Sequence, residues 1–331
     1  MTRALALHLG VIAVLLAANW LLPAYHHTNL ARIMVMAVFA MGYNIAFGYT
    51  GLLSLGHALF FAAGMYATGM GISVLQIPTG PALLLGVLAG ATMAAAVGLL
   101  ALRTGGVSFM IVTLMFAQAG YLTLLYFGAT TGGDEGFVLD RASRAIGPVD
   151  LSADMTRYLS ALALFSVALL GHLALTRTAF GRSMIAMREN EERSRMLGYN
   201  PFAVKLAALT LSGAYAGAAG AACAVMFGYV GASFAGVQYS ILPLLYVLLG
   251  GAGTVLGPFI GALVMFYLID GLQAAEVAGQ AARGQDHGSH GMTLSRRVPS
   301  RPLGAKITIR RRAAPVTNSV AVVISDDRSI R

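Results

Sequence analysis

A stretch of polar residues and glycines lies between two apolar parts of the chain, at residues 48–57, with the sequence GYTGLLSLGH. It brings Thr50, Ser54 and His57 together on flexible backbone. Polar groups at membrane depth are costly unless they are paired, so their presence there indicates function by default. We therefore predict that these side chains line a path for a polar solute. The alternative is that Ser54 bonds a backbone carbonyl and His57 caps a turn.

Ser54 and His57 also have the side chains of a nucleophile and a base, which raises the question of intramembrane proteolysis. Nucleophilic catalysis needs the base within hydrogen-bond reach and an oxyanion hole beside the nucleophile. The two residues are three positions apart, but no Gly-x-Ser-Gly turn accompanies them. We therefore predict no catalytic residues in this chain.

A glycine-rich turn with two carboxylates, TGGDEG, occupies residues 131–136. Turn chemistry alone explains its glycines, and two adjacent acids do not make a coordination set for a metal. The turn either orients a partner or closes a solvated loop. We predict no metal site there, nor at His287 and His290 near the end of the chain.

The most informative charged stretch is residues 177–205, which hold five arginines and one lysine. Within it, residues 181–198, GRSMIAMRENEERSRMLG, predict a short amphipathic helix that Gly198 ends. Little of its own protein is expected to cover the apolar face of this helix. That face consists of Met184, Met187 and Met196. We predict that this apolar face binds in a groove of a soluble partner. The alternative is that the helix lies on the membrane surface, where its arginines contact anionic lipid.

The elements that must position these residues are membrane-spanning helices. Of the 331 residues, 57% are hydrophobic and only 11% are charged, too few to cover a soluble globule. The apolar residues fall in runs of roughly twenty, the length of helix that crosses a bilayer. We predict an all-α polytopic transmembrane helical bundle of about eight spans. They are 5–22, 33–47, 58–75, 82–102, 107–127, 158–175, 206–230 and 241–269. The first resembles a signal peptide, but we expect an uncleaved helix.

Lysine and arginine in short loops set the orientation of such a bundle. The basic segment 177–205 is therefore expected on the cytoplasmic side. Counting spans backward places the more acidic loop 129–156 outside and both termini inside. The single cysteine, Cys223, lies in an apolar run and is expected to be an inert packing residue.

Glycines interrupt two of the predicted spans. Gly48, Gly51 and Gly56 follow the second span, and residues 250–258 interrupt the eighth with four glycines and a proline. Broken backbone at membrane depth must be buried in protein or line a wet cavity. The alternative is close packing of helices through small residues, which we favour for the glycine-rich run 214–222.

Five stretches of the sequence resemble the permease subunits of ATP-binding-cassette importers for branched-chain amino acids, of the longer permease type. Urea and amide permease subunits are similar. The stretches are GYTGLLSLGH at 48–57, VTLMF at 112–116, TGGDEG at 131–136, residues 181–200, and LLGGAGTVLGP at 248–258. They occur in the order of the family, and the ordered set is more specific than any one of them.

The resemblance implies an importer of two permease subunits, two cytoplasmic ATPases and a periplasmic solute-binding protein, in a bacterial inner membrane. No phosphate-binding loop of the Gly-x-x-x-x-Gly-Lys-Ser/Thr type occurs, so we expect no cofactor in this chain and ATP only in partner subunits. Glu192 and Gly198 have the spacing of the loop that docks permeases on ATPases, although arginine and serine replace its two alanines. With Arg188, they are the expected coupling residues.

The implied substrate pathway comprises Thr50, Ser54, His57, Thr113 and Gln118. Gln118 occupies a position where relatives often have an acidic residue. If this position contacts substrate, the change from acid to amide alters how the ammonium group of an amino acid is bound. The solute itself stays open between leucine, isoleucine, valine, urea and short amides, because affinity is expected to reside mainly in the binding protein.

The C-terminal region departs from the family. We divide the chain into a transmembrane permease domain, 1–271, and a non-family tail, 272–331, that is disordered or aberrant. The tail carries 10 of the 22 basic residues, and no span can be drawn through it. Our hypothesis is a reading-frame shift near residues 270–280; the alternative is a genuine divergent tail. An intact alternative frame encoding a hydrophobic helix in the coding DNA would support the shift.

Two other classes of protein compete with the importer subunit. An ion-coupled secondary carrier usually has ionisable residues within its spans. The first seven spans hold essentially none beyond His8 and His172, with His57 directly before the third. The second competing class is a membrane-bound interaction protein that has lost the ability to transport. ATP dependence of uptake separates the carrier from the importer.

Overall fold

A computed structural model of the chain describes residues 2–21, 23–147 and 149–290. It divides into two compact units, Met1–Glu276 and Val277–Arg331. All the packing considered below lies within the first unit. Most of the predicted tail 272–331, including everything after residue 290, lies outside the described residues.

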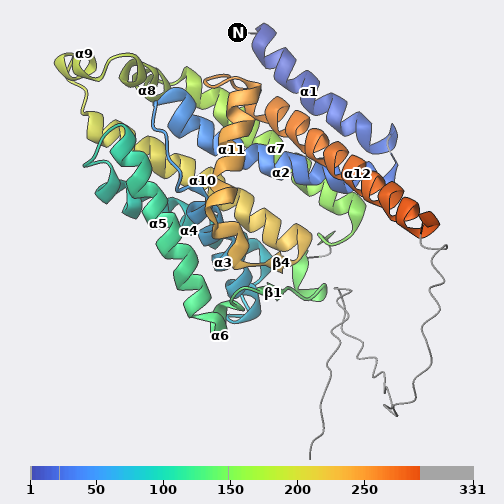
Figure 1. The fold of residues 1–331 in the computed structure, drawn as a ribbon. Coiled ribbons are helices and arrows are strands. Elements are labelled where there is room, and N and C mark those ends of the chain that lie inside the picture. The colour runs from blue at the N-terminus through green and yellow to red at the C-terminus, as the bar shows by residue number, and fades with distance from the viewer. Residues whose placement is uncertain (1, 22, 148, 291–331) are drawn as a thin grey trace, which may run out of the picture. The chain divides into compact units, whose positions relative to one another are not determined.

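The first unit is built from helices, which confirms the predicted all-α class (Figure 1). The long helices are α1 (Thr2–Leu21), α2 (Ala24–Asn44), α3 (His57–Ser73), α4 (Thr79–Ala101), α5 (Val107–Tyr126), α7 (Asp154–Arg177), α10 (Pro201–Phe227), α11 (Val237–Gly250) and α12 (Gly257–His290). The short helical elements are the π-helix η1 (Ile45–Tyr49), α6 (Gly128–Thr131), η2 (Ala142–Arg144), α8 (Ala179–Glu189), α9 (Glu191–Met196) and η3 (Ala232–Ala235).

Five helices are long and apolar enough to cross a membrane: His26–Tyr49, Thr79–Ala101, Val107–Tyr126, Asp154–Arg177 and Pro201–Phe227. Shorter apolar helices at Leu5–Leu21, Val237–Gly250 and Gly257–Gln273 account for most of the remaining predicted spans. The predicted eighth span, 241–269, is interrupted at its glycines, as the sequence predicted. Its glycines divide it into α11 and α12, which are separated by residues 251–256.

Helix α2 lies at the centre of the unit and α5 at its edge. In the most apolar 18-residue window of each helix, 89% of the residues are buried for α2 with η1, but only 17% are buried for α5. Helix α2 contacts α7, α10 and α11. A helix that is apolar all round and buried belongs to the core of a bundle, so α2 and the broken segment that follows it are enclosed by protein.

Helices α3, α4 and α10 pack with their backbones almost in contact. A Cβ placed on Gly64 of α3 would lie 2.3 Å from the carbonyl oxygen of Gly217 in α10. A Cβ on Gly90 of α4 would lie 2.5 Å from the carbonyl oxygen of Gly213. Small residues allow such close approach in membrane helices. The structure therefore confirms the packing role predicted for the glycine-rich run 214–222.

Two small antiparallel ribbons order the polar loop between α5 and α7. Strand β1 (Phe137–Val138) pairs with β4 (Tyr229–Val230), with Phe137 opposite Val230. Strand β2 (Ala145–Ile146) pairs with β3 (Val149–Asp150). This loop and the basic α8–α9 segment lie at opposite ends of the unit (Figure 1), joined by the 24 residues of α7.

Candidate functional site

The two glycine-interrupted segments meet inside the bundle and are joined by one side chain. Oδ1 of Asn44, at the end of α2, accepts a hydrogen bond from the backbone N–H of Gly253 at 2.9 Å. Nδ2 of Asn44 donates to the carbonyl oxygen of Thr254 at 2.8 Å. A Cβ on Gly48 would lie 2.6 Å from the nitrogen of Gly253. Asn44 therefore satisfies backbone groups that the break between α11 and α12 leaves free, as burial at membrane depth requires.

Arg188 connects this junction to the basic segment. It belongs to α8, yet its Nη1 donates a hydrogen bond to the carbonyl oxygen of Gly48 at the end of η1. A Cβ on Gly253 would lie 3.1 Å from the same nitrogen. Hydrogen bonds from a charged donor are stronger than neutral ones. Arg188 thus contacts both broken segments from outside them.

His57 is held by a hydrogen-bonded chain across three helices. Its Nε2 lies 2.8 Å from Oγ of Ser212 in α10, and that hydroxyl donates to the carbonyl oxygen of Gly42 in α2 at 2.6 Å. At the start of α3, the N–H of Ala58 donates to Oγ of Ser240 in α11 at 2.9 Å. His57 is fully buried. It fastens the end of the broken segment to its neighbours.

Ser54, within the broken segment, and Thr113, from α5, both bond the same stretch of its backbone. Oγ of Ser54 accepts from the N–H of Gly56 at 3.2 Å. Oγ1 of Thr113, from α5, accepts from the N–H of Leu55 at 3.2 Å and donates to the carbonyl oxygen of Met110 at 2.9 Å. The structure therefore places Ser54, His57 and Thr113 at the same stretch of the chain, where Ser54 and Thr113 bond backbone N–H groups and His57 bonds the hydroxyl of Ser212.

Thr50 and Gln118 lie apart from that group. The hydroxyl of Thr50 donates to the carbonyl oxygen of Ile45 at 2.8 Å, across η1. Gln118 is half-buried on α5 and makes no hydrogen bond to the described residues. The five residues predicted for a substrate pathway therefore occupy three separate places, and their role in transport stays a prediction.

The expected single amphipathic helix is two helices, α8 and α9, which meet at Asn190. The backbone of Asn190 is extended, and its side chain caps α9 by accepting from the N–H of Arg193 at 2.9 Å. Met184 and Met187 are both buried, and Met184 packs in a cluster with Ile45, Tyr49 and Ala208. The expectation that this apolar face is uncovered was wrong for α8, because the end of η1 packs on it.

The outward apolar surface of this segment lies at the end of α9 instead. Met196 is 86% exposed and Leu197 is 72% exposed. The N–H of Gly198 donates to the carbonyl oxygen of Arg195, and that of Tyr199 to Ser194. With φ of +89° at Gly198, this is a Schellman ending. Gly198 thus stops the helix as predicted.

Glu192, the other predicted coupling residue, is exposed on α9. Its neighbour Glu191 carries the ionic contacts: it accepts a hydrogen bond from Lys205 and lies 3.7 Å from Arg195. Among the described residues no ion pair includes Glu192. A free carboxylate on the outer surface of α9 leaves it available to a partner.

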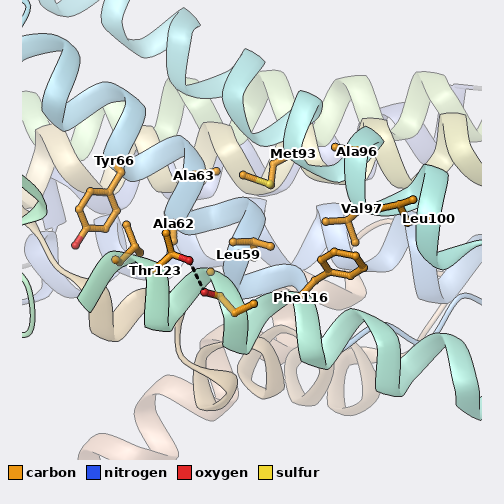
Figure 2. A pocket seen from close by; sticks show the side chains of 13 residues that line it. Leu59, Ala62, Ala63, Tyr66, Met93, Ala96, Val97, Leu100, Phe116 and Thr123 are labelled. Carbon is orange, nitrogen blue, oxygen red and sulfur yellow. Dashed lines mark hydrogen bonds between the residues drawn. The ribbon is translucent and has the colours of Figure 1, made fainter. Parts of the chain in front are cut away.

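A cavity of about 400 Å³ lies between α3, α4 and α5. Figure 2 shows that its lining is apolar, with Leu59, Met93, Val97 and Phe116 turned toward it. Its Thr123 hydroxyl donates to the carbonyl oxygen of Ala119, the bond drawn in Figure 2. Such a lining offers no partner for the charged ends of an amino acid, so this cavity suits a lipid chain or an apolar side chain.

The residues that hold the junction were not singled out from the sequence. They are Asn44, Ser212, Ser240 and Thr254. The available signal was a polar residue within an apolar run, which is expensive in a membrane unless paired. Asn44 lies inside the predicted span 33–47 and carries that signal most clearly.

The fold and this junction define a polytopic helical membrane protein with a discontinuous centre and a basic segment, α8–α9, at one end. A family model described as "Branched-chain amino acid transport system / permease component" matches residues 27–284. The chain belongs to this family. The match runs past Ile269, where the resemblance was expected to stop.

Curated relatives agree with that assignment. The high-affinity branched-chain amino acid transport system permease protein LivM of Salmonella typhimurium is 30% identical over 256 residues, which is 70% of this chain and 60% of the relative. LivM of Escherichia coli K12 gives the same values. The autoinducer 2 import system permease protein LsrC of Shigella flexneri is 31% identical over 119 residues, 34% of this chain and 35% of the relative. The chain thus aligns with about 60% of the length of the LivM relatives. No solved structure matches it.

Proposed function

We propose that this chain is the membrane-spanning permease subunit of an ATP-binding-cassette importer and translocates branched-chain amino acids across a bacterial inner membrane. Its partners are a second permease subunit, two cytoplasmic ATP-binding subunits and a periplasmic solute-binding protein. The chain itself carries no ATPase site, and its partners use the ATP. Family membership and the LivM relatives support this assignment over a urea or amide permease and over an ion-coupled carrier.

The observation that carries the proposal is the hydrogen bond from Arg188 to Gly48. It joins a basic helix at one end of the bundle to broken backbone in its interior. Movement of α8 by an ATPase would therefore reach the junction without an intermediate element. Nucleotide and partner then drive transport by binding two conformations with different affinities.

The orientation follows from the distribution of charge. Six Lys and Arg residues in 177–205 support a cytoplasmic position for this segment. The α5–α7 loop then faces the periplasm, where exposed Asp134 and Glu135 are placed to meet the binding protein. Both termini are cytoplasmic in this arrangement.

The test is uptake by the assembled complex in proteoliposomes. We expect L-leucine to accumulate only with the binding protein, with both ATPase subunits and with ATP. Urea in place of leucine serves as the competing solute. Uptake driven by an ion gradient without ATP would overturn the importer assignment, and uptake of urea but not leucine would overturn the assigned solute.

A further inference from the structure

A second cavity, of about 490 Å³, lies beside the junction at the end of the bundle that carries α8 and α9. Its walls come from the stretch after η1, the turn between α4 and α5, the α8–α9 segment and the start of α10. The polar and charged lining residues are Thr50, Thr104, Arg188, Glu191 and Lys205, and the apolar ones include Leu53, Val107, Phe109 and Met110. Small-molecule sites typically have volumes of about 300–1,000 Å³.

The charged groups of this cavity form a set of two cations and one anion. Nζ of Lys205 donates to the carboxylate of Glu191, and their side chains are 21% and 40% exposed. Arg188 donates from Nη1 to Gly48. A guanidinium has five N–H donors, so most of those on Arg188 stay available to a ligand. Bidentate geometry makes arginine a preferred partner for carboxylates.

Apolar residues line the same cavity as these charges. Leu53, from the stretch after η1, and Met110, from α5, both line the cavity. The combination differs from the cavity in Figure 2, whose lining has no charged residue. A ligand that matches this lining has a carboxylate for Arg188, an ammonium group for Glu191, whose carboxylate also accepts from Lys205, and an aliphatic side chain.

We propose that this cavity binds one zwitterionic α-amino acid with an aliphatic side chain. The carboxylate lies on Arg188, the ammonium group lies on Glu191, and the side chain packs between Leu53 and Met110. Because Arg188 also holds Gly48, the ligand occupies a place next to the junction. The role of this cavity as the last binding site of the solute before it enters the cytoplasm rests on the proposed function.

The experiment is photolabelling of the full-length chain in its assembled complex in lipid nanodiscs. The probe is a leucine analogue with a diazirine side chain, and labelled peptides are identified by mass spectrometry. We expect labelling within residues 50–53 and 107–110. L-leucine should compete, whereas isovalerate, which lacks the ammonium group, and isopentylamine, which lacks the carboxylate, should not.

Two variants test the site in different ways. Arg188→Gln removes the carboxylate partner, and Leu53→Trp fills the apolar half while leaving every charge in place. Arg188→Gln should lower labelling by about tenfold, the effect of losing one charged hydrogen bond. Leu53→Trp should lower it by taking the space of the ligand's side chain. Arg182→Gln is the matched control, because Arg182 is an exposed arginine of the same helix that does not line the cavity. It should label like the unmodified protein.

Labelling found only elsewhere, or labelling that survives both Arg188→Gln and Leu53→Trp, would overturn the proposal. Leucine uptake by the same preparation is measured in parallel. ATP-driven uptake without cavity labelling refutes the cavity and spares the importer assignment. Cavity labelling without ATP-driven uptake supports the binding site and counts against the importer.

Discussion

Nε2 of His57 lies 2.8 Å from Oγ of Ser212, and this contact fixes which nitrogen of the histidine carries a proton. The single hydroxyl proton of Ser212 is directed at the carbonyl oxygen of Gly42, 2.6 Å away. Nε2 must therefore be the donor to Ser212. The chain of bonds runs from α3 through α10 to α2, and it anchors the end of the broken segment.

Ser212→Ala should destabilise the protein by about 1–3 kcal/mol, because it leaves the buried Nε2–H of His57 unpaired and removes one of the hydrogen bonds to the carbonyl oxygen of Gly42. Thermal unfolding in detergent measures the loss. Ser166→Ala is the matched control, since the Ser166 hydroxyl bonds only within its own helix, to Leu162. Equal destabilisation by the two variants would show that the hydrogen bonds of Ser212 to His57 and Gly42 contribute no more to stability than a bond within one helix.

Arg188→Gln should separate ATP hydrolysis from uptake. The variant loses the charged hydrogen bond to Gly48, so α8 no longer holds the junction. We expect leucine uptake per ATP hydrolysed to fall by roughly tenfold, the effect of losing one charged bond. Both rates are measured in proteoliposomes. Arg182→Gln, which loses a bond to Arg177 of its own segment, is the control. A similar fall in both variants would indicate a general effect of charge.

Gly198 can be tested with substitutions that differ in their tolerance of a left-handed backbone. Its φ of +89° suits glycine, and asparagine tolerates the left-handed region better than other residues. Gly198→Asn should therefore preserve coupled uptake. Gly198→Val and Gly198→Arg should impair it while the protein still reaches the membrane. Uptake that is unchanged in all three would remove Gly198 from the coupling segment.

The close glycine contact between α3 and α10 predicts that adding a single methyl group there lowers the stability of the protein. Gly64→Ala places a Cβ 2.3 Å from the carbonyl oxygen of Gly217, so the helices must move apart. We expect a loss of about 1–3 kcal/mol, as for overpacked cores. Gly10→Ala is the control, because a Cβ there meets nothing within 4 Å. Thermal unfolding of the two variants checks the difference, and equal midpoints would contradict close packing.

The orientation can be measured by cysteine labelling, because the single native cysteine is buried. Arg193→Cys and Glu135→Cys place one exposed thiol at each end of the bundle. A membrane-impermeant maleimide added to spheroplasts should label Glu135→Cys at once and Arg193→Cys only after permeabilisation. The unmodified protein gives the background. The reverse pattern would invert the assigned topology.

The sequence was sufficient for the class of fold, since apolar length alone identifies membrane helices. It also located the two interrupted segments and the glycine that ends α9. The sequence could not show which distant residues contact each other. Asn44 and Gly253 are 209 positions apart, and no periodicity connects them. The packing of Met184 against Ile45 and Tyr49 of η1 was missed for the same reason, because an amphipathic pattern does not say which surface covers the apolar face.

Alternating access requires some helices to move and others to stay. Helices α3, α4 and α10 touch through backbone atoms, which leaves no side-chain layer to slide or re-pack. We therefore expect them to move as one rigid body throughout the transport cycle. Helix α5, of which only 17% is buried, and the two half-helices α11 and α12 are then the elements that change position. In mechanical terms, the three-helix block is the fixed frame and the broken centre is the hinge.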